Sequence, residues 1–410
     1  MHFNEITIGD FVPSRILWLT RIDPVPECDG QRIYSGRLID AVTKAGAAVD
    51  ILCFESEDPA ARNGESDKAA AWHVIEPEPR SRWASMFSSL PSVAYRCATP
   101  NMRNAFADAM TQGVWDAIIF DSLASAWALP FFEKMNVKRQ HRPKIVYVAH
   151  NHEASTRAMM ARHYRGHSPL MRYALKRDAE KTQALETRLV NAADLVTAIT
   201  PEDAEKFRAG QPSKRIIELS PGYAGRSVPK RTISEDMPRV AVIVGSFDWF
   251  AKRLNLESFI KVADPIFADA GVRLRVIGDG PPGYIDKLRA RTEAIDFLGR
   301  VPSIDPHIAD ARIALVPERV GGGFKLKILD YVFHRLPILA IDGSISGAPL
   351  YTPSSVLTFS SFEELANGVV AAIDNVHLLN QLQTNAYDNC AQSFNWYDRG
   401  EKLVASMAAA

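Results

Sequence analysis

The sequence predicts an α/β protein with two doubly wound parallel sheets, and three observations lead to this prediction. Short apolar runs alternate with helical patterns along most of the chain. At 410 residues the chain exceeds what one hydrophobic core usually supports. The segment Pro221–Pro238 is rich in proline, glycine and charge and lacks apolar periodicity, as expected of a boundary.

Each half contains its own set of predicted strands. In the first half they are Ile16–Leu19, Val49–Cys53, Ala117–Phe120, Ile145–Ala149 and Leu195–Ala198, with helices such as Tyr34–Ala45 and Met102–Gln112 between them. In the second half they are Val240–Val244, Arg273–Ile277, Ala294–Leu298, Ile313–Val316 and Ile338–Ala340. We expect domains at residues 1–225 and 235–388, followed by a final helical segment at 389–410. Two Rossmann-like lobes of this kind would direct the carboxyl ends of their strands at a shared central cleft.

The composition excludes several classes of protein. A net charge of zero argues against nucleic-acid binding by bulk charge. The four cysteines are far apart, which suits a reducing cytoplasm and argues against a disulfide framework or a structural zinc. The N-terminus has no apolar run like a signal peptide, and no apolar segment reaches the ~18 residues of a spanning helix. We therefore expect a cytoplasmic protein that is at most peripheral to a membrane.

The segment Ile313–Asp342 is the most informative part of the chain. It reads as a buried strand, three glycines (Gly321–Gly323), a helix with Lys325 and Lys327 in its first turns, and a second buried strand. Glycines let the backbone approach a ligand closely, and a helix start offers unpaired N–H groups to an anion. This pattern predicts an anion site, and we expect its ligand to be a diphosphate. The alternative is a tight connection with solvated lysines.

Several motifs, in their order and spacing, resemble those of a known enzyme family. YVAHNHEASTR is similar to an "HN-x-E" segment, VIVGSFDWFAKRLNLESF occupies the place of a donor-phosphate loop, and VIGDGP and GGGFKLKILD are similar to "G-x-G-P" and "G-x-G-T-R-L-K-I-L-E" segments. The chain resembles a GT-B glycosyltransferase of the family-4 type, the glycosyl transferases group 1 superfamily. It departs at the family's paired glutamates, which align with Gly322 and Asp330, and at a donor-phosphate arginine, which aligns with Ser246.

The resemblance implies a hexosyltransferase-type enzyme that moves a sugar from a nucleotide-diphosphate sugar to a saccharide or lipid-linked, for example polyprenyl-linked, saccharide acceptor. It implies retention of configuration, a role in bacterial surface-polysaccharide assembly, and a final helix that crosses back to the first domain. We expect no cofactor. The sequence has no Asp-x-Asp motif, so a metal bridge to the diphosphate is not indicated. Two alternatives stay open. One is a sugar-nucleotide epimerase of the same fold, and the other is a non-catalytic sugar-nucleotide-binding subunit.

In the second half, fixed cations and backbone amides are the candidates for stabilising a departing diphosphate. They are Lys252, Lys325 and the amides of Gly322, Gly323 and Phe324. Lys252 could instead be a surface lysine. Further candidates for donor binding are Ser246, Arg300 near the base, Glu318 near the sugar, and Asp330 on ribose hydroxyls. Asp330 is expected two turns into its helix, where it could instead pair with Lys327, and Glu318 could simply pair with the neighbours of Arg319.

In the first half, the candidate is His150, which follows a buried strand at its carboxyl end. The resemblance implies that this histidine lies beside the donor sugar, and it could also orient an acceptor hydroxyl. The alternative is a structural histidine. Gly30 and Gln31 begin the first helix after a loop with two prolines, and could approach the diphosphate. Plain loop chemistry is the alternative.

Two segments suggest an anionic membrane surface as a further partner. Ser81–Arg96 combines aromatic residues with arginines, and Arg157–Lys181 holds seven Arg or Lys residues against two acidic ones. Such stretches suit the surface of an anionic membrane. A solvated helix face is the alternative reading of both.

Overall fold

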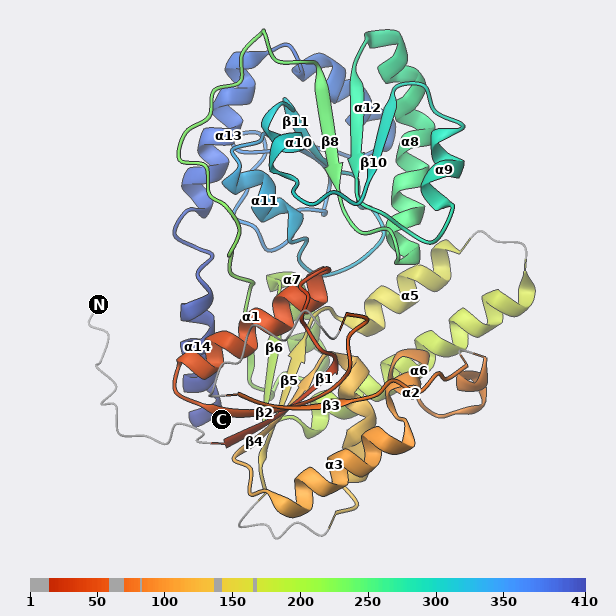
Figure 1. Ribbon diagram of the computed structural model, residues 1–410, viewed down its shortest axis with the longest axis vertical. Helices are drawn as coiled ribbons and strands as arrows, with labels where there is room; N and C mark the ends of the chain where they lie inside the picture. Colours follow the sequence, from red (N-terminus) through yellow and green to blue (C-terminus); the bar gives the residue numbers. More distant parts are fainter. Residues whose placement is uncertain (1–14, 59–69, 82, 136–141, 165–167) are drawn as a thin grey trace. The chain divides into compact units, whose positions relative to one another are not determined.

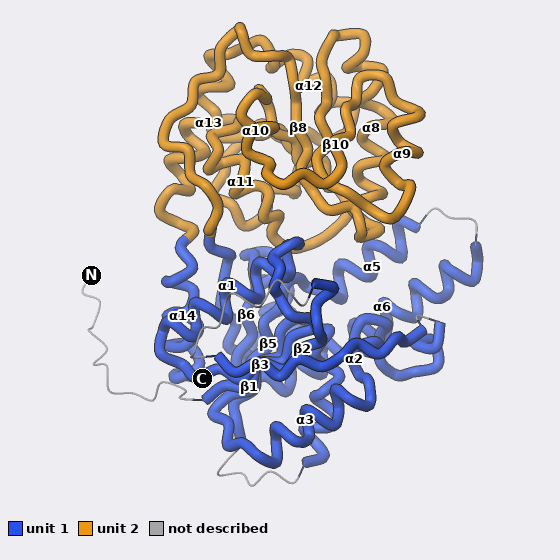
Figure 2. The backbone as a smooth tube through the Cα atoms, in the orientation of Figure 1, with its two compact units in different colours: residues 1–222, 395–410 blue, residues 223–394 orange. Residues whose placement is uncertain are grey.

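The computed structural model describes residues 15–58, 70–81, 83–135, 142–164 and 168–410. The chain forms two compact units, residues 1–222 with 395–410 and residues 223–394 (Figures 1 and 2). The chain thus passes from the first unit to the second after Gly222 and returns after Phe394. The N-terminal residues 1–14, expected to lack a signal peptide, lie outside the described residues.

The first unit contains a seven-stranded parallel sheet within its described residues, in the order β3-β2-β1-β4-β5-β6-β7. The strands are β1 (Arg15–Ile22), β2 (Ala48–Phe54), β3 (Ala70–Ile75), β4 (Ala117–Asp121), β5 (Lys144–Ala149), β6 (Leu195–Ala198) and β7 (Ile216–Glu218). The helices are α1 (Gly30–Lys44), η2 (Ala84–Phe87), α2 (Ser92–Cys97), α3 (Pro100–Gln112), η3 (Leu123–Ala128), α4 (Leu129–Phe132), α5 (Glu153–His163), α6 (Pro169–Ala192), α7 (Pro201–Gly210) and α14 (Trp396–Ala408).

The second unit contains a six-stranded parallel sheet in the order β10-β9-β8-β11-β12-β13. Its strands are β8 (Val240–Val244), β9 (Arg273–Ile277), β10 (Ile295–Gly299), β11 (Ile313–Val316), β12 (Ile338–Ile341) and β13 (Leu357–Phe359). Its helices are α8 (Phe250–Ala270), α9 (Tyr284–Arg289), α10 (Asp305–Ala309), α11 (Lys327–Phe333), α12 (Phe362–Ala372) and α13 (Val376–Cys390). The prediction of two Rossmann-like α/β sheets is confirmed.

The predicted strands are all present, with ends shifted by a few residues, but three edge strands escaped prediction. These are β3, β7 and β13, whose residues are mostly half-exposed. The first helix begins at Gly30, as expected from the proline-containing loop before it, and not at Tyr34, where its apolar pattern starts. The reason is an N-cap, because the Asp29 carboxylate accepts hydrogen bonds from the N–H groups of Gln31 and Arg32 at 2.9 and 3.0 Å.

The last helix, α14, belongs to the first unit and packs against α1. Gly400 allows this close approach, because a Cβ atom there would lie 2.1 Å from the carbonyl oxygen of Ala41. At the start of α14 the Trp396 ring meets the Tyr34 ring edge-to-face, with 5.6 Å between centroids. The chain therefore returns to the sheet from which it started.

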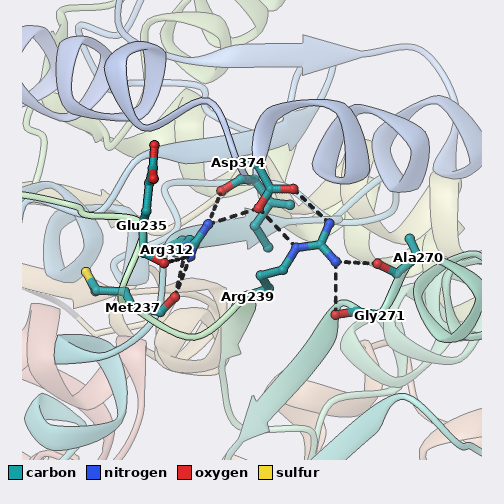
Figure 3. Close-up of polar contacts among 8 residues, drawn as sticks. Glu235, Met237, Arg239, Ala270, Gly271, Arg312 and Asp374 are labelled. Atoms are coloured by element: carbon teal, nitrogen blue, oxygen red, sulfur yellow. Dashed lines mark hydrogen bonds and ion pairs between the residues drawn. The ribbon is translucent and has the colours of Figure 1, made fainter.

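In the second unit, an arginine clasp fixes the amino ends of the central strands (Figure 3). Buried Arg312, just before β11, donates to the carbonyls of Glu235 and Met237 and to the Asp374 carboxylate at 3.0 Å. Arg239, just before β8, binds the same carboxylate through two hydrogen bonds of 3.0 and 2.9 Å. The clasp lies at the end of the sheet opposite the loops that follow β8 and β11, so it anchors the sheet without occupying those loops.

Candidate functional site

The glycine-rich loop follows β11 in the second unit. Gly321 and Gly323 have φ values of +129° and +67°, a region that side chains rarely adopt. After them, turn-type bonds run from the N–H of Ile328 to the carbonyl of Lys325 and from Leu329 to Leu326, both at 2.9 Å. Helix α11 therefore begins only at Lys327. Lys325 precedes the helix and Asp330 lies in its first turn, so the expectation that Lys325 lies inside it and Asp330 two turns along was wrong.

A buried asparagine holds this loop against helix α8. The Asn255 side-chain amide donates to the Val320 carbonyl at 2.6 Å, and its oxygen accepts from the N–H groups of Arg319 and Val320 at 3.1 and 2.9 Å. Lys252 lies three residues earlier, in the first turn of α8. Asn255 thus brings the glycine-rich loop and the start of α8 together. Sequence reasoning missed it, and a polar residue amid the apolar pattern of a helix was its only signal.

An ion pair closes the base of the loop. Lys327 binds Glu318, and both side chains are largely buried, at 12% and 15% exposed. Lys327 is therefore the partner of Glu318. The structure does not have the alternative pair of Lys327 with Asp330. It also does not pair Glu318 with the neighbours of Arg319. The second carboxylate oxygen of Glu318 is buried and accepts no hydrogen bond from the described residues. The Lys325 ammonium group lies 3.3 Å from the Gly323 carbonyl oxygen.

Asp330 lies among polar groups of the same unit. Burial raises the pKa of its carboxyl to about 6, although the charge of His334 and a hydrogen bond from Tyr223 act in the opposite direction. His334 in turn binds the Asp330 carbonyl at 2.8 Å and the Asp305 carboxylate at 3.0 Å. Phe324 packs its ring against Phe394, with 5.8 Å between centroids. The loop and the first turn of α11 are therefore well anchored.

The loop after β8 lies next to the glycine-rich loop, because β8 and β11 are neighbours in the sheet. Here the Ser246 hydroxyl donates to the Asp248 carboxylate at 2.9 Å. Arg253, which sequence reasoning did not single out, donates to the carbonyls of Phe247 and Asp248 at 2.9 and 2.6 Å. Arg300 is exposed and follows β10, two strands from β8. The structure thus brings Ser246, Lys252 and the loop together and leaves Arg300 further along the sheet edge.

In the first unit, His150 directly follows β5 and pairs with an acidic residue that sequence reasoning missed. Its Nε2 atom lies 2.6 Å from Oδ1 of Asp121, the last residue of the neighbouring strand β4. The other Asp121 oxygen accepts from the Trp18 indole N–H at 3.0 Å. Burial raises the pKa of Asp121, but the charge of His150 and the hydrogen bonds from His150 and Trp18 outweigh it, so the pKa lies below its usual value.

Gly30 and Gln31 form the first turn of α1 in this unit, and the Gln31 N–H is already bound by the Asp29 carboxylate. Tyr34, one turn along α1, meets the His150 ring edge-to-face at 5.1 Å between centroids, and its hydroxyl donates to the Leu219 carbonyl at 2.7 Å. Burial, with the Asp121 charge, raises the pKa of Tyr34 well above its usual value. Tyr34 is therefore an uncharged side chain that packs against the His150 ring.

The described residues contain neither a metal-ligand cluster nor a membrane-spanning helix. No group of three or more His, Cys, Asp or Glu side chains among them is arranged to hold a metal ion. Within the same part of the chain, no helix is both long and apolar enough to cross a membrane.

Comparison with known proteins identifies the second unit. Residues 238–375 match the family model described as "Glycosyl transferases group 1". This match covers most of the second unit. No curated protein matches the chain.

Solved structures extend the fold comparison to nearly the whole chain. Sucrose-phosphate synthase from Thermosynechococcus elongatus has a TM-score of 0.70 and 17% identity, with 97% of this chain and 100% of that chain covered. WaaG, described as a glycosyltransferase involved in lipopolysaccharide biosynthesis, has a TM-score of 0.62 and 16% identity, covering 96% and 100%. HepE of Anabaena in complex with UDP-glucose has a TM-score of 0.61 and 15% identity, covering 97% and 100%. The family match and this fold confirm the prediction of a GT-B glycosyltransferase of group 1.

Proposed function

We propose that the chain transfers a sugar from a nucleoside-diphosphate sugar to a saccharide or lipid-linked saccharide. The observation that supports this most is the glycine-rich loop after β11, with two left-handed glycines, a buried clamp from Asn255 and Lys325 just before α11. This loop lies within the residues that match the glycosyltransferase family. The Anabaena structure was determined with UDP-glucose, which supports a donor of the same class here.

The transfer breaks the bond between the anomeric carbon and the diphosphate oxygen and joins that carbon to an acceptor oxygen. It releases a nucleoside diphosphate and a proton. We assign stabilisation of the diphosphate charge to Lys252, Lys325 and the N–H groups of Gly322 to Phe324, without a metal or other cofactor. Asp330 would accept hydrogen bonds from ribose hydroxyls, while Ser246, Glu318 and Arg300 would complete the donor site. Retention of configuration at the anomeric carbon is part of the proposal.

In the first unit, we assign His150 to a hydroxyl group of the donor sugar or of the acceptor. Its position directly after β5 supports this, because ligands of such sheets bind at the carboxyl ends of the strands. Gly30, at the start of α1, would approach the diphosphate through its backbone, whereas Gln31, whose N–H is bound by Asp29, would take part through its side chain. The assignments of these residues depend on donor binding, and the absence of donor binding would remove them.

We further propose a role in bacterial surface-polysaccharide assembly, carried out in the cytoplasm at the inner face of the membrane. The description of WaaG, a protein of lipopolysaccharide biosynthesis with the same fold, supports this context. So do exposed apolar side chains at η2 and at the start of α6, where Phe87 is 94% and Leu170 is 56% exposed. Large exposed apolar groups beside basic residues suit binding to an anionic membrane surface.

The test is an assay of nucleoside-diphosphate release by the full chain. UDP-, GDP- and ADP-sugars are each supplied with and without lipid-linked saccharides extracted from bacterial membranes. The proposal predicts that one donor gives release that depends on the acceptor, with a glycosylated product of matching mass. Conversion of the donor to its epimer without any acceptor would contradict it and favour an epimerase. Donor binding with no turnover on any acceptor extract would favour a binding subunit.

A further inference from the structure

Three neighbouring strands of the first unit place a chain of hydrogen bonds behind His150. Trp18 lies on β1, Asp121 ends β4 and His150 follows β5, and these strands are adjacent in the sheet. The Trp18 side chain is fully buried, as is Asp121, and the His150 side chain is 10% exposed. The carboxylate thus lies between two ring nitrogens, with one oxygen 3.0 Å from the indole and the other 2.6 Å from the imidazole.

The donor and acceptor rules fix the protons in this chain. An indole N–H can only donate, and an ionised carboxylate can only accept. Trp18 therefore occupies Oδ2 of Asp121 as a donor, and Nε2 of His150 must carry the proton that Oδ1 accepts. In a neutral imidazole the other nitrogen then has a free lone pair. Because Nε2 is bound to Asp121, Nδ1 is the ring nitrogen that remains for a ligand.

We propose that Asp121, oriented by Trp18, is a positioning residue that fixes the tautomer of His150, so that Nδ1 accepts a hydrogen bond from a hydroxyl of the sugar or acceptor. The inference rests on the proposed function for the identity of that hydroxyl. Tyr34 supports it, because its edge-to-face contact with the imidazole at 5.1 Å restricts the ring orientation. In this tautomer Nδ1 of His150 accepts a hydrogen bond, whereas in the opposite tautomer Nδ1 would donate one.

The arrangement predicts an unusual consequence of Asp121→Asn. An asparagine has one accepting oxygen and one donating NH2 group. Trp18 still needs an acceptor, so the Asn oxygen faces Trp18 and the NH2 group faces His150. The nearby Ser35 hydroxyl can donate or accept and fits either orientation. His150 must then accept at Nε2 and carry its proton at Nδ1, which is the wrong tautomer for the proposed role.

Removal of the indole N–H should reverse this effect. In the double variant Trp18→Phe with Asp121→Asn, no donor holds the Asn oxygen, so the amide can rotate and offer that oxygen to His150. The single variant Trp18→Phe keeps the carboxylate and therefore the wild-type tautomer, and it serves as the matched control for the lost core volume. A purely structural role for Asp121 predicts no recovery, because Trp18→Phe removes buried volume and does not restore the lost carboxylate.

The experiment reads the tautomer directly by 15N NMR of the imidazole in the full chain without substrate, at a pH where the ring is neutral. His150 is assigned from the resonance missing in His150→Gln. We expect a proton on Nε2 in the wild type and in Trp18→Phe, on Nδ1 in Asp121→Asn, and on Nε2 again in the double variant. Acceptor-dependent kcat/KM should fall by about 10- to 100-fold in Asp121→Asn and recover at least about tenfold in the double variant.

A proton on Nδ1 in the wild type would overturn the inference, as would a double variant that remains as inactive as Asp121→Asn. If Asp121→Asn does not fold, the wild-type spectrum still decides the assignment of the proton. The tautomer is measured without substrate, so a failure of the proposed function, seen as no turnover by the wild type, is distinguishable from a failure of this inference.

Discussion

At the scale of single residues, Glu186 is a buried carboxyl that holds the start of a helix. It lies on α6 and is 2% exposed. Its oxygens accept from the Tyr147 hydroxyl at 3.0 Å and from the N–H groups of Glu153 and Ala154 at 2.9 and 2.8 Å. Burial raises the pKa of Glu186 to about 7, although the hydrogen bonds from the two N–H groups and Tyr147 oppose it. The stability of the first unit therefore depends on pH near neutrality.

The sign of this dependence follows from proton uptake. Between the usual glutamate pKa of 4.5 and about 7, the folded unit binds a proton that the unfolded chain has lost. The free energy of unfolding should therefore decrease as pH rises through this window, by on the order of 3 kcal/mol. Glu186→Gln removes this titrating group. The free energy of unfolding of the variant should therefore rise relative to that of the wild type as pH increases.

The measurement is urea unfolding at pH values from 4.5 to 8, followed by tryptophan fluorescence. Six of the seven tryptophans lie in the first unit, so the signal reports mainly on that unit. The glutamine leaves one N–H of α5 without its acceptor, so only the pH dependence is compared and not the absolute stability. Parallel curves for the two proteins would show that Glu186 is not the group responsible.

At the candidate site, the sequence predicted the glycine-rich loop but not the partners of the charged and polar side chains. The glycine triplet indicated a close backbone approach, and Gly321 and Gly323 indeed have positive φ. The partners of charged groups were not predictable, because Asp121 and His150 are 29 residues apart and meet only through the sheet. Asn255 likewise clamps a loop 65 residues further on. Such contacts depend on tertiary structure, which local patterns do not contain.

At the scale of elements, burial explains which strands the sequence revealed. Strands buried on both faces, such as β4 and β11, read as continuous apolar runs and were predicted. The edge strands β3 and β13 carry half-exposed residues and gave no such run. Apolar periodicity did not locate helix ends that a capping side chain or a turn decides, as Asp29 does at α1. These ends depend on single hydrogen bonds, which apolar periodicity cannot locate.

Two elements of the first unit carry the surface for which we propose binding to an anionic membrane. The Lys181 ammonium group of α6 donates to the carbonyls of Ser85 and Met86 at 2.8 and 2.9 Å, which ties η2 to this helix. The exposed apolar side chains near these elements are Trp83, Phe87, Leu170 and Tyr173. The exposed basic residues of α6 include Arg172, Lys176 and Arg177. The sequence segments that predicted this surface also contain residues 82 and 165–167, which lie outside the described residues.

We expect the full chain to co-sediment with phosphatidylglycerol-containing vesicles and to be released by high salt, because basic groups lose their attraction when screened. Phe87→Ser should weaken this binding several-fold, since its ring is 94% exposed and available for insertion. Val114→Ser is the matched control, since Val114 is also exposed, at 69%, but follows α3. Equal binding of both variants, or none by the wild type, would remove the proposal of a membrane surface at η2 and α6.

At the scale of the whole molecule, the two units differ in how far their roles could be inferred. The second unit holds the residues that match a family model, and its glycine-rich loop, neighbouring cations and Asn255 clamp form one connected group. The first unit, with the returning helix α14, offers His150 and its partners, and its acceptor is not encoded in a short motif. The family-level activity is thus established, whereas donor and acceptor rest on the proposed function.

The central claim is that the glycine-rich loop of the second unit binds the diphosphate of the donor. Isothermal titration calorimetry of the full chain with UDP, GDP and ADP tests it most directly, on the wild type, on Lys325→Ala and on the control Lys261→Ala, whose side chain is exposed on α8. The account predicts that one nucleotide binds, that Lys325→Ala weakens it about tenfold or more, or ~1.4 kcal/mol, and that Lys261→Ala does not. Binding that is unchanged in Lys325→Ala, or no binding of any nucleoside diphosphate, would contradict it.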